Sequence, residues 1–509
     1  MINLEDVSFM YAGENRGAVN NISLNIPKGE FIVLCGESGC GKTTITRLIN
    51  GLIPHFCEGK ISGKVSINGQ LIEQQHLYET AKLVGSVFQN PRSQFFNVDT
   101  TSEIAFGCEN FAVPKQEIEK RIERTVNNFN MKKLLGMNIF HLSGGEKQKI
   151  ACASVYTMEP EIFVMDEPSS NLDLSSIMEL RKILSLWKKQ GKTIVISEHR
   201  LFYLRGLADR FIYVRDGRIE HEYSSKDFEN LDGEERMAMG LRIYSLDEIK
   251  LERKITPPTR TLQLRDFCFS HKNQPETLHI KECDIPAQRV TAIIGNNGAG
   301  KSTFARCFCG LEKNCGKIIY NGQSMKPKDR LNACYMVMQE VNHQLFTESI
   351  SDEIKISMEH DDENLEKEIL EQLDLILYRD RHPMSLSEGQ KQRVAIASAA
   401  ASKRPILVFD EPTSGLDFRH MKEVASILKE LQEKGKTVYV ITHDLELIAD
   451  CCTDVIHLEN GRIVDQYPMD KDGLLKIEKY FIKEESLTII GGILSSSTGG
   501  GWTAFIILG

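Results

Sequence analysis

Short apolar runs alternate along the chain with segments that can be helical, and four of these runs form two matching pairs. Phe31 to Cys35 and Val290 to Ile294 each lead into a glycine-rich segment, whereas Ile162 to Met165 and Ile406 to Phe409 each end in two acidic residues. Short strands that alternate with helices are typical of a mostly parallel sheet with crossover helices. The pattern therefore predicts an α/β fold that is built twice.

The first pair of runs leads into the pattern G-x-x-x-x-G-K-[ST]. In such a loop the glycines let consecutive backbone N–H groups curve around phosphate oxygens, the lysine reaches the β- and γ-phosphates, and the hydroxyl helps to hold Mg²⁺. Two matches in the same strand-to-helix context predict two nucleotide sites. The binding residues are Gly36, Gly39, Gly41, Lys42, Thr43 and Thr44 in the first copy and Gly295, Gly298, Gly300, Lys301, Ser302 and Thr303 in the second.

The second half repeats the landmarks of the first half in the same order. The opening glycines of the two loops are 259 positions apart, Gln89 and Gln339 are 250 apart, and from Ser143 and Ser387 onward the offset stays at 244. A repeat of about 240 residues is a whole domain rather than a solenoid unit. We predict a domain over 1–240, a linker over 241–260, a second domain over 261–480 and a tail over 481–509.

Composition narrows the class of protein. The 509 residues are 41% hydrophobic and 26% charged, and the net charge of −9 argues against a nucleic-acid partner. The 13 cysteines form no C-x-x-C pair, which favours reduced thiols over a zinc site. The N-terminus has no signal-peptide pattern, and no run is apolar enough over a sufficient length to cross a bilayer.

The tail differs from the rest of the chain because it carries no charge from Ser486 to Gly509. Its middle, Ser495 to Gly501, consists only of Ser, Thr and Gly, which argues against a membrane span. Three interpretations stay open. They are a loosely ordered appendage, a contact with a membrane or partner, and a processed peptide or gene-level accident.

The second pair of apolar runs supplies the candidate catalytic carboxylates. These runs end in Asp166-Glu167 and Asp410-Glu411. In P-loop nucleotidases a carboxylate at this strand end helps to hold Mg²⁺. The next carboxylate can position and polarise the attacking water. Because the pair occurs twice, downstream of two P-loops, we expect ATP hydrolysis rather than an accidental acidic turn.

The order of the motifs resembles that of ABC ATPases over almost the whole chain. The matching residues are Gln89 and Gln339 (Q-loop), Leu142 to Glu146 and Leu386 to Gln390 (signature), Asp173 and Asp417 (D-loop), and His199 and His443 (switch histidine). The resemblance implies two tandem ABC domains. Each would have a mostly parallel core sheet, an antiparallel β subdomain and a helical subdomain that carries the signature.

The resemblance further implies that the two domains pair head to tail within the chain, with each ATP between the P-loop of one domain and the signature of the other. A Ser and a Gly at a helix N-terminus supply donors and a positive dipole end to the γ-phosphate. Site one then consists of Tyr11, Lys42, Thr43, Gln89, Asp166, Glu167 and His199, closed by Ser387 and Gly389. Site two consists of His271, Lys301, Ser302, Gln339, Asp410, Glu411 and His443, closed by Ser143 and Gly145.

The same resemblance assigns roles. The expected catalytic residues are Glu167, Glu411, His199 and His443, and the expected Mg²⁺ ligands are Thr43, Gln89, Asp166, Ser302, Gln339 and Asp410. Tyr11 would stack on adenine, and its counterpart His271 offers a smaller ring. Both sites keep their lysine and both glutamates, so we expect both to hydrolyse ATP.

The signatures carry two departures from the family pattern. Glu388 stands where the second copy usually has its first Gly, and Glu146 stands where the first copy usually has Gln. The Glu388 carboxylate either repels the γ-phosphate and slows site one or points to solvent. We expect a change in site-one turnover in Glu388→Gly if the first alternative holds.

The segment after the first Q-loop resembles the ATPases of energy-coupling factor transporters, which import cobalt and vitamins. The matching residues are Phe88 to Phe96 and Glu103 to Gly107, with Gln344 to Phe346 and Asp352 to Ile354 in the second copy. The resemblance implies that the regions Gln89–Phe96 and Gln339–Phe346 dock integral membrane partners. It places the chain peripherally, at the cytoplasmic face of a prokaryotic cell membrane.

Other tandem ABC classes are the alternatives. Translation factors of the ABC-F type act on ribosomes and carry a long charged helical linker, whereas the predicted linker here is short. The motor of another ABC transporter class is the remaining alternative. Recovery with small membrane proteins or cosedimentation with ribosomes would discriminate the two main hypotheses.

Overall fold

The computed structural model describes most of the chain. It covers residues 1–13, 17–170, 172–249, 251, 255–270, 276–320 and 322–480. His271, the predicted counterpart of Tyr11, and the tail 481–509 lie outside the described residues.

A six-stranded sheet forms the centre of the first half, in the order β10-β9-β3-β8-β7-β6. Its strands are β3 (Phe31–Cys35), β6 (Val84–Val87), β7 (Ile162–Asp166), β8 (Thr193–Ser197), β9 (Arg210–Arg215) and β10 (Arg218–Ser224). All neighbours are parallel except β9 and β10. Every residue of β3 and β8 is buried, as expected for central parallel strands that are covered on both faces.

A four-stranded antiparallel sheet and a helical subdomain complete the first half. The sheet has the order β2-β1-β4-β5 and consists of β1 (Ile2–Tyr11), β2 (Val19–Ile26), β4 (Gly59–Ile67) and β5 (Gln70–Leu71). The main helices are α1 (Lys42–Ile49), α4 (Thr100–Asn110), α5 (Lys115–Asn128), α6 (Gly144–Thr157) and α7 (Leu174–Lys189). Helix α6 begins with a capping box between Ser143 and Glu146, which fixes the predicted signature at its N-terminus.

The second half repeats this architecture. Its sheets have the orders β12-β11-β14-β15 and β16-β17-β18-β13-β19-β20. The strands are β11 (Thr261–Ser270), β12 (Glu276–Pro286), β13 (Val290–Ile294), β14 (Lys317–Tyr320), β15 (Gln323–Met325), β16 (Cys334–Val337), β17 (Ile406–Asp410), β18 (Thr437–Ile441), β19 (Asp454–Glu459) and β20 (Arg462–Pro468). The main helices are α10 (Lys301–Phe308), α12 (Ile350–Lys355), α13 (Glu363–Gln372), α14 (Glu388–Ala401), α15 (Phe418–Glu433) and α16 (Leu445–Cys451). The predicted fold class is confirmed.

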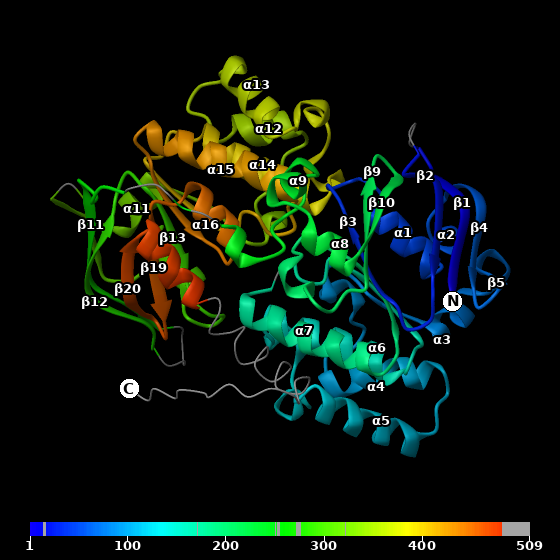
Figure 1. Ribbon diagram of the computed structural model, residues 1–509. Coiled ribbons are helices and arrows are strands. Elements are labelled where there is room, and N and C mark those ends of the chain that lie inside the picture. The colour runs from blue at the N-terminus through cyan, green and yellow to red at the C-terminus, as the bar shows by residue number, and fades with distance from the viewer. Residues whose placement is uncertain are drawn as a thin grey trace, which may run out of the picture.

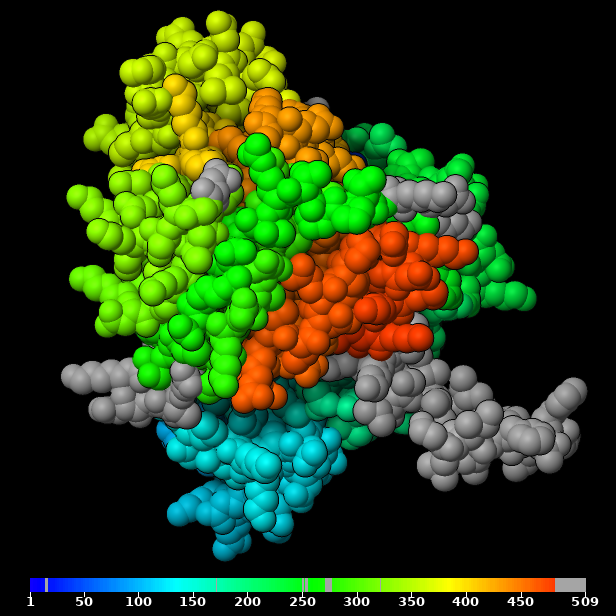
Figure 2. All heavy atoms as spheres, turned by 90° about the vertical axis from the view of Figure 1, so that its left-hand side faces the viewer, coloured from blue at the N-terminus to red at the C-terminus, as the bar shows by residue number. Residues whose placement is uncertain are grey.

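The two halves lie side by side with opposite orientation. Figure 1 shows the helical subdomain of the first half, α4 and α5, at one end of the molecule and that of the second half, α12 and α13, at the other. In Figure 2 the cyan residues of the first half project beyond the face formed by the second half. This arrangement places the N-terminus of α6 toward the second half and the N-terminus of α14 toward the first.

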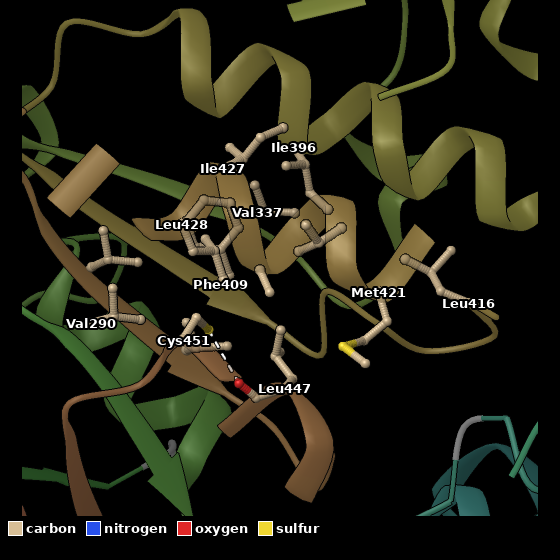
Figure 3. Packing of buried hydrophobic residues seen from close by; sticks show 14 of the residues in the cluster. Val290, Val337, Ile396, Phe409, Leu416, Met421, Ile427, Leu428, Leu447 and Cys451 are labelled. Atoms are coloured by element: carbon tan, nitrogen blue, oxygen red, sulfur yellow. Dashed lines mark hydrogen bonds between the residues drawn. The ribbon is translucent and has the colours of Figure 1, made fainter. Parts of the chain in front are cut away.

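Apolar packing joins the halves as well as filling each of them. Figure 3 shows the core of the second half, where Val290, Phe409 and Leu428 come together from two strands and a helix. Leu174 and Met178 of α7, in the first half, belong to this same buried cluster. The apolar contact therefore continues across the boundary between the halves.

Candidate functional site

The first P-loop is shaped by glycines that no other residue could replace. Gly36 and Gly41 have φ angles of 143° and 111°, and a Cβ atom on Gly36 would lie 2.1 Å from the Val214 carbonyl oxygen. The buried Lys42 side chain curls into the loop, where its Nζ donates to the carbonyl oxygens of Gly36 at 2.9 Å and Glu37 at 2.8 Å. These bonds hold a cation at the centre of a concave loop.

The carboxyl end of β7 meets this loop. Thr43 Oγ1 donates to Asp166 Oδ1 at 3.1 Å, and Ser197 Oγ donates to the same oxygen. Burial and the neighbouring charge of Glu167 raise the pKa of the Asp166 carboxyl. Two adjacent carboxylates and a hydroxyl are the oxygen donors that Mg²⁺ prefers, and a divalent cation would relieve the repulsion between them. The residues present fit the predicted metal.

Glu167 is held by the two residues that the sequence placed around it. Gln89 Nε2 donates to Glu167 Oε2 at 2.7 Å, and His199 Nε2 lies 3.2 Å from Oε1. Burial would raise the pKa of Glu167, but the neighbouring His199 and Lys42 hold it below its ordinary value. Glu167 is therefore an oriented, ionised carboxylate.

The second half closes this site. A cavity of about 340 Å³ lies between the first P-loop and the N-terminus of α14. Across the boundary, the backbone N–H of Ser38 donates to Asp417 Oδ2 at 2.6 Å. The predicted site-one residues that line the cavity are Tyr11, Gly39, Gly41, Lys42, Thr43, Thr44, Gln89, Glu167, Ser387 and Gly389. The structure thus brings the first P-loop and the second signature together.

Tyr11 lies at the rim of this cavity with its ring fixed from two sides. Its ring packs edge-on against Phe9 with centroids 4.8 Å apart, and its hydroxyl accepts a bond of 3.0 Å from Arg47. The same hydroxyl lies 3.3 Å from Thr44 Oγ1. An aromatic face held in this way is suited to stacking on a flat ligand.

Site two has the same parts in a looser arrangement. Lys301 Nζ donates to the carbonyl oxygens of Gly295 at 2.5 Å and Asn296 at 3.2 Å, and the N–H of Asn297 donates to Asp173 Oδ2 at 3.1 Å. A cavity of about 1120 Å³ borders Asn296 and Asn297 of the second P-loop and Ser143 and Gly145 of the first signature, but its lining does not include Lys301 or Glu411.

The catalytic candidates of site two are less tightly coupled than those of site one. His443 Nε2 lies 3.8 Å from Glu411 Oε1, and within the described residues neither ring nitrogen of His443 has a hydrogen-bond partner. Burial raises the pKa of Glu411 to about 7, and burial together with Lys301 lowers the pKa of His443 to about 3. Gln339 lines a different cavity of about 380 Å³, which it shares with Gln89.

The two signatures differ at their caps. In both caps the side chain accepts from the serine N–H, at 2.9 Å for Glu146 and 3.0 Å for Gln390. At the first signature Ser143 Oγ also donates to Glu146 Oε2 at 2.8 Å. The Glu388 side chain is 58% exposed and lies 3.2 Å from Lys391 Nζ. It also borders the site-one cavity.

The sequence did not predict a role for two buried arginines that lie near the D-loops. Arg200 directly follows His199, and Arg242 lies in the predicted linker; they are 9% and 2% exposed. The one available signal for Arg242 is a charge among apolar neighbours, in Leu241-Arg242-Ile243-Tyr244. Such a signal does not say which partners the side chain meets.

Comparison with known proteins decides the family. A family model described as "ABC transporter" matches residues 19–170 and 278–414. A protein of Treponema denticola named "Putative ABC transporter ATP-binding protein" is 44% identical over 485 residues, which cover 94% of this chain and 99% of its own length. The chain belongs to the ABC transporter family. A relative of the same name from Lactobacillus johnsonii is 32% identical, with 96% and 93% of the two chains covered.

Solved structures share the tandem fold of this ABC protein. The archaeal ribosome recycling factor aABCE1, in its complex with the ribosomal stalk protein aP1, has a TM-score of 0.66 and 21% identity, with 94% and 92% of the two chains covered. At 21% identity, this similarity shows a shared fold only. Membership of the family makes the chain an ATP-hydrolysing enzyme. In the part of the chain that the structure describes, no helix has the length and apolarity to cross a membrane.

Proposed function

We propose that this ABC ATPase powers a membrane importer of the energy-coupling factor type, with two ATP molecules bound between its halves. The observation that carries the proposal is a phenylalanine that both halves expose at the same position. Phe96 and Phe346 are 76% and 72% exposed, and each follows the Q-loop of its half. The names of the similar proteins refer to transport, which also supports this proposal.

In the first half, two polar side chains hold the loop that presents Phe96. Gln94 Oε1 accepts from the N–H of Phe88 at 3.3 Å, which ties the loop to its own Q-loop. The buried Glu103 accepts from the N–H groups of Phe96 at 3.0 Å and Asn97 at 2.8 Å. The ring of Phe96 therefore projects from a fixed backbone.

The second half repeats this support. Gln344 Oε1 accepts from the N–H of Met338 at 2.7 Å. The buried Glu353 accepts from the N–H groups of Phe346 and Thr347, each at 3.1 Å. A solitary exposed apolar residue needs no explanation, but two that are supported by the same pair of side chains, a Gln and a buried Glu, fit a docking surface for apolar helices.

At site one, the proposed chemistry follows from the oriented groups. Lys42 and the loop N–H groups bind the phosphates, and the Ser387 hydroxyl and the N-terminus of α14 meet the γ-phosphate from the other half. Glu167 positions and polarises the attacking water, with Gln89 and His199 holding its carboxylate. Glu411 and His443 have the corresponding roles at site two.

The oxygen ligands of Mg²⁺ at site one would come from Thr43, Asp166 and Gln89, and those at site two from Ser302, Asp410 and Gln339. When bound, the ion supplies charge neutralisation for the β- and γ-phosphates. The raised pKa of Asp410, which is caused by burial, matches that of Asp166 and indicates the same readiness to accept a cation.

Hydrolysis is linked to the docking surface through the Q-loop. Gln89 contacts the carboxylate at one end of the segment, and Phe96 faces outward at the other. ATP that binds both a P-loop and the opposite signature favours the closed state of the halves, and hydrolysis removes that preference. The docked helices would follow this opening and closing.

The proposal is tested by recovering the tagged full chain from detergent-solubilised membranes of the cells that make it. We expect small integral membrane proteins to copurify with it, and we expect Phe96→Asp together with Phe346→Asp to abolish their recovery. Phe56→Asp is the matched control, since Phe56 is 77% exposed but lies outside both Q-loop regions. Thermal unfolding of each variant would show that the fold is intact.

The ribosome-acting alternative predicts a different result. In that case the chain would cosediment with ribosomes on a sucrose gradient. Few membrane proteins would copurify with the unmodified chain, and the two Phe→Asp substitutions would not change their amount. That outcome would overturn the importer proposal without affecting the assignment as an ATPase.

A further inference from the structure

The segment that leaves the first half does not run over the surface as a simple linker. Leu241, Arg242 and Tyr244 are 4%, 2% and 2% exposed; Leu241 and Tyr244 pack into the core of the first half, and Arg242 between them bonds the second half. Arg242 is the one of these three that carries a charge. A buried charge is stable only where partners surround it.

Arg242 has partners on every edge of its guanidinium, and all of them belong to the second half. Its Nη2 and Nε donate to the Leu416 carbonyl oxygen at 2.9 Å and 3.2 Å. Its Nη1 donates to Asp444 Oδ2 at 2.7 Å and to Glu446 Oε2 at 3.2 Å. This planar fork is a geometry that lysine cannot reproduce.

These partners adjoin both ATP sites. Leu416 directly precedes Asp417, whose carboxylate accepts from Ser38 in the first P-loop. Figure 3 shows the Leu416 side chain beside Met421 at the edge of the second core, so the D-loop is held by apolar packing on one side and by Arg242 on the other. Asp444 directly follows His443 of site two.

The first half holds its own D-loop in a different way. Arg200 occupies the position that corresponds to Asp444, and Leu172 corresponds to Leu416. Arg200 Nη1 donates to the Leu172 carbonyl oxygen at 3.2 Å. The first half therefore supplies this arginine from its own switch segment, whereas the second half has an aspartate there and takes its arginine from the linker.

We propose that Arg242 is a positioning residue that sets the second D-loop for catalysis at site one. Arg242 is covalently continuous with the first half, which contains the P-loop of that site. By bonding Leu416 it fixes Asp417 relative to Ser38 across the boundary. Asp444 balances its charge, so the same contact also links the D-loop to the switch segment of site two. The proposal goes beyond the ATPase activity and does not depend on the nature of the transported cargo.

The test separates the two sites. In the Glu411→Gln background, which leaves site one active, we expect Arg242→Lys to lower kcat about tenfold and to change KM for ATP less than twofold. In the Glu167→Gln background, which leaves site two active, we expect less than a threefold loss. Arg210→Lys is the matched control, because the Arg210 guanidinium likewise bonds two carboxylates and a carbonyl oxygen, and all three partners, Glu222, Glu30 and Asn25, belong to the first half.

A rescue variant distinguishes positioning from a merely structural role. Arg242→Ala combined with Asp444→Arg copies the arrangement of the first half, and we expect it to recover at least half of the site-one kcat. Arg242→Lys remains decisive even where this double variant fails to fold. The proposal is overturned if Arg242→Lys lowers the midpoint of thermal unfolding but leaves kcat unchanged, or if it slows both sites equally.

Discussion

The two ATP sites contain the same motifs but differ in how tightly their parts are joined. At site one, Glu167 accepts from Gln89 at 2.7 Å, and the cavity between P-loop and signature is about 340 Å³. At site two, the distance from His443 Nε2 to Glu411 Oε1 is 3.8 Å, whereas the matching distance from His199 to Glu167 at site one is 3.2 Å. A duplicated fold has thus produced one site whose candidate catalytic groups are in contact and one whose groups lie farther apart.

The difference arises from a few contacts rather than from the fold. The strands, the P-loops and the D-loop contacts to the opposite P-loop are present twice, with Ser38 bonded to Asp417 and Asn297 bonded to Asp173. What differs is the environment of the carboxylate, Glu167 or Glu411, that we propose to position the attacking water. A preorganised carboxylate needs less rearrangement before reaction, so we expect site one to be the faster site.

The largest expected effect comes from removing the two carboxylates separately. Glu167→Gln should lower turnover at its own site about 100-fold or more, because general-base assistance contributes about 10²–10⁴. If site one carries most of the flux, the total rate of phosphate release should fall much more in Glu167→Gln than in Glu411→Gln. Steady-state phosphate release by the full chain measures this directly.

Glu161→Gln is the control for this comparison, since Glu161 lies at the opposite end of β7 and pairs with Lys28 on the surface. It should leave the rate within about twofold of the unmodified chain, as is usual for exposed ion pairs. Equal losses in Glu167→Gln and Glu411→Gln would show that the tighter geometry of site one has no kinetic consequence.

The pH dependence of the two sites should also differ. Burial raises the pKa of Glu411 to about 7, whereas His199 and Lys42 hold that of Glu167 below its ordinary value against the effect of burial. Lowering the pH from 8 to 6 therefore protonates Glu411 and leaves Glu167 ionised. We expect the rate of the Glu167→Gln variant to fall about tenfold over this range.

The Glu411→Gln variant, which retains Glu167, should change by less than about twofold over the same pH range. A shared profile would mean that another group controls both sites. Measuring kcat at saturating ATP and Mg²⁺ at each pH separates the titration of the carboxylate from effects on nucleotide binding.

The sequence predicted those parts of this comparison that depend on local pattern. The buried strands, the glycine conformations of the P-loops and the order of motifs follow from short-range chemistry, and the duplicated offset of 244 correctly matched Asp166 with Asp410. The contacts of Arg242 were not predictable because its partners lie about 170 to 200 positions away. The unequal contacts of Glu167 and Glu411 likewise depend on how distant segments of the chain come together.

A smaller difference is expected from the signature caps. The Ser143 hydroxyl donates a hydrogen bond to Glu146, so it is less available to a γ-phosphate at site two, and the carboxylate adds a negative charge there. Glu146→Gln should release the hydroxyl and increase site-two turnover about threefold. A threefold change in rate corresponds to a smaller free energy than a typical hydrogen bond contributes. The rate is measured in the Glu167→Gln background.

The reciprocal substitution checks this reasoning at site one. Gln390→Glu, measured in the Glu411→Gln background, should slow site one by a similar factor because it creates the cap found at Ser143. If both substitutions leave their sites unchanged, the identity of the capping residue does not contribute to the difference between the sites.

The smallest expected effect concerns Glu388, the departure from the family pattern beside site one. Its side chain is 58% exposed and lies 3.2 Å from Lys391 Nζ, so solvent and a neighbouring cation both screen its charge. Glu388→Gly restores the residue found at Gly144 in the first signature and should change site-one turnover by less than about twofold in the Glu411→Gln background. A threefold or larger increase would instead mean that the carboxylate repels the γ-phosphate, and the signature of the second half would then be the part that restrains the tighter site.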